Sequence, residues 1–352
     1  MKIDFSILKK FDILLLDDNI SNLSFKNFSS YQADTKKINF FILVKTLFSF
    51  VLNKKKLSLK QLYKKNLYDH ISPKIAISHH INQKGQECKK LCPYIKLLVY
   101  QFSYFHEHKY QNFKIDKSLN CDYFLTWSIK DKKFFSKKNF NKIKVCGSIR
   151  NNNINIIKKK EKFKLMLISE YDPRDINKNS YLVNNLKKFL SIIDSFCLKK
   201  NITLMIALRS KRKDKKFDIV SEKNYFHQIM NCKKVFDEEN KNSYETAYES
   251  NVAVCFHSNL GFELLSRKKK VMFLPFHENK LKKNHYLDKR NNFHIHRKIN
   301  KKEIFTKLEN LITLKQKDWK RKISKKKYLI KYDPNNTILN QIIAKLISNR
   351  FF

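Results

Sequence analysis

A short stretch in the second half of the chain, HSNLGFELLSRKKKVMFLP at residues 257–275, has the residue types and spacing of an anion-binding turn. The apolar, β-branched run before it, 251–256, predicts a buried strand, and the apolar spacing after the turn predicts a helix that ends near Arg267. The first N–H groups of a helix have no partner within the helix and carry the positive end of its dipole. The chemistry predicted for this stretch is therefore the binding of phosphate or another anion.

Five residues of the stretch could contribute to such a site. His257, Ser258 and Asn259 lie in the turn, where Ser258 or Asn259 can cap the helix. Gly261 is one of only three glycines in 352 residues, and Glu263 lies one turn further along the helix. A glycine allows close approach either of a ligand or of a neighbouring part of the chain. The local pattern alone leaves both interpretations open: a ligand site, or a helix cap with a packing glycine.

Strand and helix candidates alternate along the chain, which predicts an α/β fold with mainly parallel sheets. The predicted strands are 12–16, 74–78, 95–101, 123–127, 143–147, 163–169, 202–208, 252–256 and 271–274. The predicted helices are 41–54, 58–70, 180–199, 221–230, 243–250, 259–267 and 337–349. The predicted organisation is an N-terminal Rossmann-like domain (1–150), a polar linker (151–162), a C-terminal Rossmann-like domain (163–335) and a C-terminal helix (336–352) that folds back on the first domain. We expect both domains to be doubly wound, with a cleft between them.

Polar residues directly after strands are the second group of candidates, because ligands of doubly wound sheets bind outside the carboxyl ends of the strands. They are Asp17, Asp18, His79, His80, Gln101, Gly147, Ser148 and Arg150 in the first domain, and Ser169, Glu170, Arg209 and 257–259 in the second. Only nine of the 75 basic residues are arginines, and Arg150 and Arg209 each follow a strand. Their position favours fork-like contacts with phosphate or carboxylate, which lysine cannot make.

Charge and cysteine content narrow the class of protein. The formal net charge of +44 would suit a nucleic-acid-binding protein, but lysines supply most of it and are spread along the whole chain, with Asn, Ile and Phe also abundant. That pattern is typical of AT-rich codon usage, so we expect no specific nucleic acid and, instead, attraction to an anionic membrane surface. Seven cysteines without a close pair indicate the reducing cytoplasm and no metal site. The apolar segment 40–52 is too short to span a bilayer and predicts a buried or interfacial helix.

Segments throughout the chain resemble the bacterial surface carbohydrate (surface polysaccharide) biosynthesis proteins, a group of GT-B-like glycosyltransferases. The segments are FDILLLDD (11–18), KINFFILVKTLF (37–48), SPKIAISHH (72–80), IKLLVYQFSYF (95–105), DYFLTWSIKDKKFFSKKNFNKIKVCGSIRNN (122–152), LMLISEYD (165–172) and SYETAYESNVAVCFHSNLGFELLSRKKKVMF (243–273). The chain departs from the family pattern at 79–80, 101–103 and 257–259, where relatives tend to have Ile-Asp-Asn, Gln-Asn-Gly and Asp-Ser-Thr.

The resemblance implies a GT-B fold whose C-terminal domain holds a nucleotide-sugar donor without a metal or other cofactor. It also implies a role in making lipopolysaccharide O-chain, capsule or a similar glycan, with a glycan or lipid-linked acceptor. On this basis Ser258 and Asn259 would hold phosphate, Gly261 would let the nucleotide approach, and Glu263 would accept hydrogen bonds from ribose. Arg209 would meet the charge that develops on the leaving group.

Glycosyl transfer with inversion needs a general base whose pKa is close to the working pH, and His79 or His80 is the candidate, with Glu87 behind them. Gln101, Gly147, Ser148, Arg150, Ser169 and Glu170 are expected to line the cleft. The segment 257–275 also resembles sugar 2-epimerases and polyol-phosphate transferases, so these activities stay open. A basic nucleic-acid-binding or scaffold protein is the non-enzymatic alternative.

Overall fold

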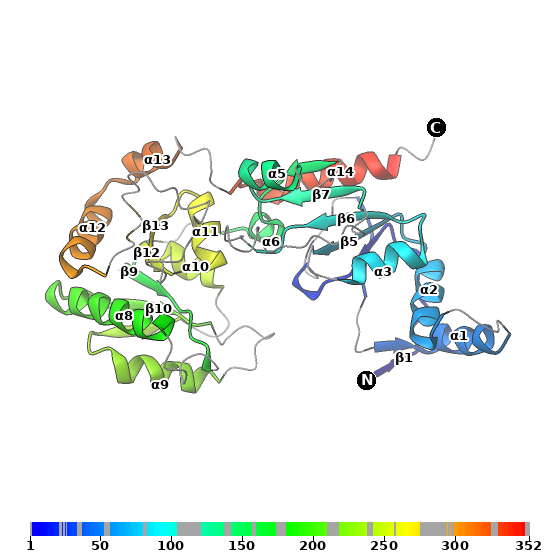
Figure 1. Ribbon diagram of the computed structural model, residues 1–352, viewed down its shortest axis with the longest axis horizontal. Helices are drawn as coiled ribbons and strands as arrows, with labels where there is room; N and C mark the ends of the chain where they lie inside the picture. The colour runs from blue at the N-terminus through cyan, green and yellow to red at the C-terminus, as the bar shows by residue number, and fades with distance from the viewer. Residues whose placement is uncertain are drawn as a thin grey trace. The chain divides into compact units, whose positions relative to one another are not determined.

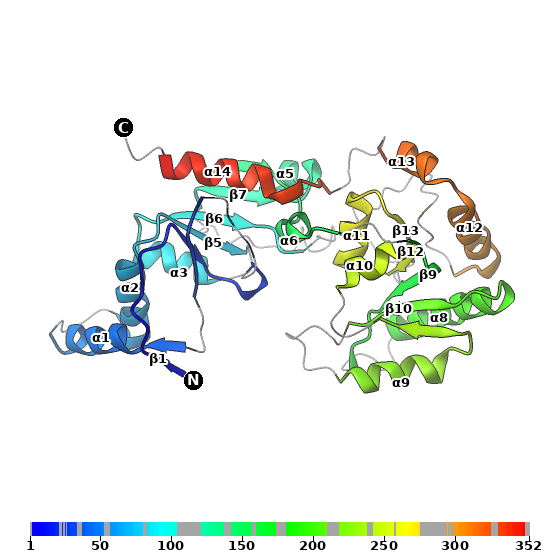
Figure 2. The ribbon, with the colours of Figure 1, turned by 180° about the vertical axis from the view of Figure 1, so that it is seen from behind.

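The chain forms two compact units in the computed structural model (Figures 1 and 2). The structure describes residues 2–20, 23, 25, 27–33, 37–52, 57–79, 83–103, 121–136, 142–156, 160–173, 181–209, 218–237, 242–256, 258–274, 294, 296, 299–324 and 330–348. Among these residues, unit 1 comprises those up to 103, those of 121–154 and those from 331 onward, and unit 2 comprises those of 155–330. The predicted cleft concerns the placement of one unit relative to the other, and it stays a prediction.

Unit 1 is built on a six-stranded parallel sheet with the strand order β3-β2-β5-β6-β7-β8. Its strands are β2 (Ile13–Leu15), β3 (Ser30–Gln32), β5 (Ile75–His79), β6 (Lys96–Tyr100), β7 (Tyr123–Thr126) and β8 (Ile143–Val145). A separate parallel pair joins β1 (Lys2–Asp4) to β4 (Lys37–Asn39). The helices are η1 (Asp18–Ile20), α1 (Phe40–Leu52), α2 (Leu59–Ile71), α3 (Gln83–Leu91), α5 (Ile129–Ser136), α6 (Ile149–Asn153), η2 (Pro334–Asn336) and α14 (Thr337–Ser348).

Unit 2 is built on a five-stranded parallel sheet with the order β11-β10-β9-β12-β13. Its strands are β9 (Phe163–Ile168), β10 (Leu204–Ala207), β11 (Lys234–Phe236), β12 (Ser250–Cys255) and β13 (Lys270–Phe273). Its helices are α8 (Tyr181–Lys199), α9 (Ile219–Ile229), α10 (Ser243–Tyr248), α11 (Asn259–Ser266), α12 (Lys301–Thr313) and α13 (Gln316–Ser324). The predicted α/β class with parallel sheets is confirmed.

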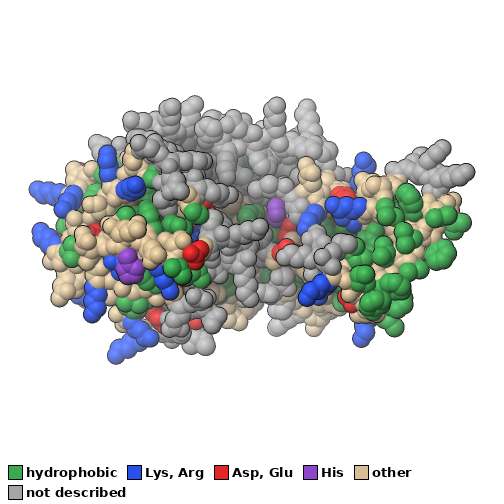
Figure 3. All heavy atoms as spheres, turned by 90° about the horizontal axis from the view of Figure 1, so that it is seen from below, with side chains coloured by type: hydrophobic (Ala, Val, Ile, Leu, Met, Phe, Trp, Pro, Cys, Tyr) green, Lys and Arg blue, Asp and Glu red, His purple; other side chains and the backbone are tan. Residues whose placement is uncertain are grey.

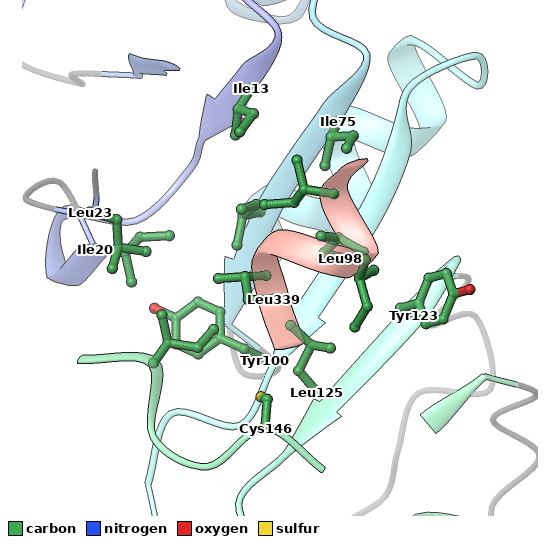
Figure 4. Close-up of a cluster of buried hydrophobic side chains, with 14 of the residues drawn as sticks. Ile13, Ile20, Leu23, Ile75, Leu98, Tyr100, Tyr123, Leu125, Cys146 and Leu339 are labelled. Carbon is green, nitrogen blue, oxygen red and sulfur yellow. The ribbon is translucent and has the colours of Figure 1, made fainter. Parts of the chain in front are cut away.

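Alternate residues of the strands in unit 1 face two different helical layers. On one face of the sheet, Leu98 and the buried side chains of neighbouring strands that point the same way pack against Leu339 of α14. Figure 4 shows this helix lying over the strands. On the other face, α3 lies so close to the sheet that a Cβ at Gly85 would be 2.9 Å from the Ser78 Cβ. Phe135 of α5 packs against Phe124 of β7 on that same face, with ring centroids 4.5 Å apart. The last helix of the chain therefore completes the core of the first sheet.

The Asn-rich segment after β8 is folded, although the sequence placed a linker there from residue 151. Asn152 is fully buried, and its side-chain amide donates to the Cys146 carbonyl at 2.7 Å and to Asn336 at 3.1 Å. Its side-chain oxygen accepts from the Asp333 N–H at 3.0 Å. These bonds tie 331–336 to unit 1, whereas the sequence division ended the second domain at 335. The asparagines at this point serve as hydrogen-bonding groups of the core.

Within the described residues, the structure contains no helix both long enough and apolar enough to cross a membrane.

A substitution at Gly147 tests the close contact between the loop after β8 and Lys331. The Gly147 φ of +79° lies in the left-handed region, and an added Cβ would lie 2.0 Å from the carbonyl oxygen of Lys331. We expect Gly147→Ala to lower the free energy of unfolding by about 3 kcal/mol or more, because backbone strain and a backbone clash add together. Urea unfolding monitored by circular dichroism measures this. Gly85→Ala, whose new methyl group would meet side-chain atoms of Ser78 and Leu97 rather than backbone, is the matched control and should cost less; equal costs would contradict this account.

Candidate functional site

The strand order of each sheet reverses direction at one place, and polar side chains gather at both places. In unit 1 the chain crosses from β2 to β3 on one side and continues through β5 on the other. In unit 2 it crosses from β9 to β10 on one side and from β12 to β13 on the other. Doubly wound sheets place the helices of oppositely directed, right-handed crossovers on opposite faces, and they bind ligands at the carboxyl ends of the two strands where the order reverses. The side chains after β2, β5, β9 and β12 are therefore the candidates that the topology selects.

Asp17 and His79 meet at the reversal point of unit 1. The Asp17 carboxylate accepts a 2.6 Å hydrogen bond from the His79 backbone N–H, and its other oxygen lies 3.4 Å from His79 Nε2. Asp17 is 3% exposed, whereas the His79 side chain is 19% exposed. A buried carboxylate therefore orients a histidine that still reaches the surface.

The surroundings of His79 favour the neutral imidazole. Phe102 lies against it with ring centroids 5.1 Å apart, and Tyr100 meets it edge-on at 6.2 Å. Burial lowers the pKa of His79 below its usual 6.5, the Asp17 charge raises it in part, and Lys84 lowers it further. At neutral pH the ring is thus neutral and has a lone pair that can accept a proton.

Gln101 and Ser148 have local structural roles. Gln101 is 1% exposed, and its side chain accepts from the Trp127 N–H at 2.9 Å and donates to the Ser103 carbonyl at 3.0 Å. Ser148 caps α6 by accepting from the Asn151 N–H at 3.4 Å. Gln101 and Ser148, together with Gly147, hold the loops in place. Contact of these three residues with a ligand remains a prediction.

Arg150 lies close enough to Tyr100 for its charge to lower the pKa of that phenol, which burial and Asp17 raise. The arginine is therefore part of the same group as Asp17 and His79. Its predicted interdomain role depends on the placement of the two units and stays a prediction.

Glu87 has a partner on a neighbouring helix, and its predicted place behind the histidines stays a prediction. The Glu87 carboxylate, on α3, pairs with Lys64 of α2. The carboxylate that contacts His79 is that of Asp17. His80, the other predicted base, lies outside the described residues, as does His257.

A buried carboxylate also organises the reversal point of unit 2. Glu222 of α9 is fully buried and accepts hydrogen bonds from the Ser169 hydroxyl and, at 3.0 Å, from the Arg209 N–H. Ser169 Oγ in turn accepts from the Tyr171 N–H at 3.2 Å. The ends of β9 and β10 are thus joined through one glutamate, which the sequence analysis did not identify as part of the site.

Arg209 holds the loop that follows β9. Its guanidinium donates to the carbonyl oxygens of Glu170 and Tyr171 at 3.2 and 3.0 Å, and it lies 3.5 Å from the buried Asp172 carboxylate. The guanidinium therefore positions residues 170–172, and its predicted contact with a leaving group remains a prediction. The guanidinium group, whose fork geometry suggested phosphate binding, contacts two backbone carbonyls and a carboxylate in this structure.

Helix α11 begins at the predicted turn after β12. The Ser258 side chain is the N-cap and accepts from the Leu260 N–H at 3.3 Å, and Asn259 is the first helical residue. A Cβ at Gly261 would lie 2.3 Å from Cys255 Sγ, so close packing of α11 on β12 accounts for this glycine. The charge of Glu170 helps burial to raise the pKa of Cys255, and the Ser258 backbone N–H hydrogen bond lowers it. Glu170 and Ser258 therefore both lie near Cys255, at the carboxyl end of β12.

Glu263 lies under the helix rather than at its surface. It is 1% exposed, and its carboxylate accepts a 2.6 Å hydrogen bond from the Tyr244 hydroxyl of α10. The Arg267 guanidinium lies over the Tyr244 ring at 5.7 Å. The contact with ribose that the resemblance assigned to Glu263 remains a prediction, and Tyr244 is a partner that sequence reasoning missed.

Two tyrosines, Tyr171 and Tyr225, lie near the carboxyl end of β9 in unit 2. Tyr171 follows β9, and its ring centroid lies 5.4 Å from that of Tyr225 on α9. Burial raises the pKa of Tyr225 to about 12, and its hydroxyl has no hydrogen-bond partner among the described residues. A buried donor of this kind is a polar group available to a ligand. No sequence pattern singled out either residue, because the chain contains 16 tyrosines.

Across the part of the chain that the structure describes, no group of three or more His, Cys, Asp or Glu side chains is arranged to hold a metal ion.

Solved structures of other proteins have a similar fold. The fold resembles the UDP-GlcNAc 2-epimerase of Neisseria meningitidis bound to UDP-GlcNAc, with 12% identity, a TM-score of 0.55 and coverage of 99% of this chain and 100% of that one. It also resembles the Methanocaldococcus jannaschii UDP-GlcNAc 2-epimerase in complex with UDP-GlcNAc and UDP, with 11% identity, a TM-score of 0.54 and the same coverage. These similarities show the fold, which is α/β and GT-B-like, as the sequence predicted.

A family model described as "putative O-antigen biosynthesis protein" matches residues 101–347. The chain belongs to that family, since the match covers more than half of its length. No protein of curated function matches the sequence.

A double substitution tests whether packing explains Gly261. We expect Gly261→Ala to destabilise the protein by about 1–3 kcal/mol, because the new methyl group overlaps Cys255 Sγ. Adding Cys255→Ala removes the sulfur and should recover part of that loss, giving a non-additive cycle in urea unfolding. Additive costs would mean that the methyl group does not meet the sulfur.

Proposed function

We propose that this chain is an enzyme of surface polysaccharide biosynthesis that transfers a sugar from a nucleotide-sugar donor to a glycan or lipid-linked acceptor. The observation that carries the proposal is the placement of polar side chains at the strand-order reversal of both sheets, in a chain of the O-antigen biosynthesis family. Doubly wound sheets bind their ligands at that position. Further support comes from the similar fold of enzymes whose structures hold UDP-GlcNAc.

The donor is proposed to bind at the carboxyl edge of unit 2. The N-terminal N–H groups of α11 and the Ser258 hydroxyl would bind its phosphates, since the helix dipole and unpaired N–H groups favour an anion there. The loop at 170–172, held by Arg209, contributes Tyr171 beside the buried hydroxyl of Tyr225. This arrangement gives a phosphate contact on β12 and an aromatic wall on β9, two neighbouring strands.

The acceptor is proposed to be activated by His79. If Nε2–H is directed to Asp17, the lone pair lies on Nδ1 and can remove a proton from an acceptor hydroxyl. The Asp17 charge would then stabilise the imidazolium that forms. Loss of the proton makes the hydroxyl oxygen a nucleophile for the anomeric carbon, and the nucleotide departs with the bonding electrons.

A nucleotide-sugar 2-epimerase is the second candidate, favoured by the similarity of fold over nearly the whole of both chains. Product analysis separates the two: a transferase releases nucleotide only when an acceptor is present, whereas an epimerase converts the donor alone. Incubation of the protein with UDP-GlcNAc and other nucleotide sugars, with and without lipid-linked glycan, followed by chromatography of both substrates, gives the answer. Conversion of the donor to its epimer without an acceptor would overturn the transferase assignment.

A substitution at the histidine tests the catalytic assignment. We expect His79→Gln to lower kcat by about 10²–10⁴-fold with little change in donor affinity, because a general base contributes this much. In the wild type, activity should fall as pH drops through the pKa of His79, with a midpoint below 6.5, since only the neutral ring accepts a proton. Asp17→Asn removes the charge that raises this pKa, so the acid limb should move to lower pH. If the acid limb of the pH–activity profile does not shift in Asp17→Asn, His79 is not the group whose titration limits activity.

A matched pair of helix caps tests the donor site. Ser258→Ala and Ser58→Ala each remove an N-cap hydroxyl, at about 1 kcal/mol of stability, but Ser58 caps α2 of unit 1. Calorimetry should show donor affinity reduced about tenfold by Ser258→Ala and unchanged by Ser58→Ala, because a hydrogen bond to a charged phosphate is lost only at 258. Equal affinities in both variants would remove Ser258 from the site.

A further inference from the structure

Helix α1 is attached to unit 1 along one narrow stripe. Its only buried residues are Ile42 and Thr46, one turn apart. Thr46 donates to the Ile42 carbonyl at 2.6 Å and accepts from the Asn66 side chain of α2 at 3.2 Å. Asn39 fixes the start of the helix, since its side chain accepts from the Ile42 N–H at 3.2 Å and donates to the Ser6 carbonyl at 2.7 Å. The helix is thus firmly seated while most of its surface stays open.

The open surface is strongly apolar. Near the end of α1, Phe48, Val51 and Leu52 are 67%, 77% and 79% exposed. Phe5, beside β1, extends the surface, because its ring centroid lies 5.0 Å from that of Phe40. Together these side chains form what is called here the α1 patch: Ile3, Phe5, Ile7, Phe40, Phe41, Leu47, Phe48, Phe50, Val51 and Leu52. Figure 3 shows hydrophobic side chains gathered at the end of the molecule that carries α1 and β1.

An apolar surface of this extent marks a binding surface, and the charges around it identify the partner. Residues 35–68 contain nine lysines and no Asp or Glu, and two of the nine, Lys64 and Lys65, pair with Glu87 and Asp69. Lys37 of β4, Lys45 of α1 and Lys60 of α2, the helix that contacts α1, are exposed. Phenylalanine and leucine on one surface with lysines at its border are typical of a helix that lies in the headgroup region of an anionic membrane.

We propose that the α1 patch docks unit 1 on an anionic membrane surface, with α1 lying in the plane of the interface. A second copy of the chain fits less well, because a two-fold contact would bring the same lysines of both copies together. The cores of protein–protein interfaces are also depleted in lysine, whereas Lys45 lies within the apolar helix. Membrane docking concerns a surface outside both reversal points, so it stands or falls independently of the proposed activity.

The test uses the full-length protein and sedimentation with vesicles. Wild-type protein should pellet with vesicles of phosphatidylcholine and phosphatidylglycerol, and much less with phosphatidylcholine alone or at high salt. The variant Phe48→Ser/Val51→Asn/Leu52→Ser should bind at least about tenfold more weakly, because apolar area no longer enters the interface. Ile129→Ser/Leu198→Ser/Val220→Asn changes three side chains of similar exposure on α5, α8 and α9, and it should bind like the wild type.

A gain-of-signal measurement covers the case in which the triple variant fails to fold. The chain has two tryptophans, Trp127 and Trp319, and both are fully buried. Leu52→Trp adds an exposed reporter whose emission should shift to the blue and be quenched by brominated lipid in anionic vesicles. Val220→Trp should show neither change.

Absence of binding to anionic vesicles, or equal binding by patch and control variants, would overturn the proposal. So would a dimer in sedimentation velocity that the patch variant converts to monomer without any vesicle binding, since the patch would then join two copies.

Discussion

Both candidate sites depend on one constraint: in each parallel sheet the strand order reverses at one point, and the site residues lie at the carboxyl ends of the strands there. Each sheet is wound outward from a central pair, β2 and β5 in unit 1 and β9 and β12 in unit 2. Because the crossovers leave each pair in opposite directions, the carboxyl ends of these strands are the position at which doubly wound sheets bind ligands. Asp17 and His79 lie at this position in unit 1, and Glu170 and Ser258 lie at it in unit 2. The chemistry proposed for the chain follows from which side chains stand there.

Buried carboxylates fix the geometry at both edges. Asp17 binds the backbone and ring of His79, and Glu222 binds the ends of β9 and β10. Such groups remain buried because hydrogen bonds compensate their loss of water. Arg209 adds a third fixed point by holding two carbonyl oxygens of the following loop. Rigid support of this kind is what a site needs to keep a substrate in a reactive position.

The three glycines show how tightly the helices are seated. Each stands where a Cβ would lie within 3 Å of another group: Ser78 at Gly85, the Lys331 carbonyl at Gly147 and Cys255 at Gly261. A chain so poor in glycine thus uses it where two parts of the chain approach closely: helix against sheet at Gly85 and Gly261, and loop against loop at Gly147. The question raised by the turn at 257–275 is answered by packing: Gly261 lets α11 approach β12, and this approach puts Ser258 at the edge of the sheet.

The main strands and helices could be predicted from the sequence because apolar strands and amphipathic helices carry a strong pattern. All nine predicted strands and all seven predicted helices are present, within a few residues of their predicted ends. The strands β1, β3, β4 and β11, each three residues long, were missed.

Side-chain contacts between residues far apart in the sequence could not be predicted in the same way. Asp17 was recognised only as a residue after a strand, and Glu222, Tyr225 and Tyr244 lie on helices without any local signal. Glu87 was assigned to the histidines from its position in the chain, yet the turn of α3 directs its carboxylate to Lys64. Which side chains meet is decided by tertiary packing, which spacing along the chain does not encode.

The most direct measurement is hydrogen–deuterium exchange of the intact protein with and without UDP-GlcNAc and other nucleotide sugars. The proposed site predicts slower exchange of the amides at 169–172 and at the start of α11, 258–263, when the donor is bound. The Ser258→Ala variant should lose that protection. Slower exchange confined to other segments, or none with any nucleotide sugar, would contradict the claim that the reversal point of unit 2 is the donor site.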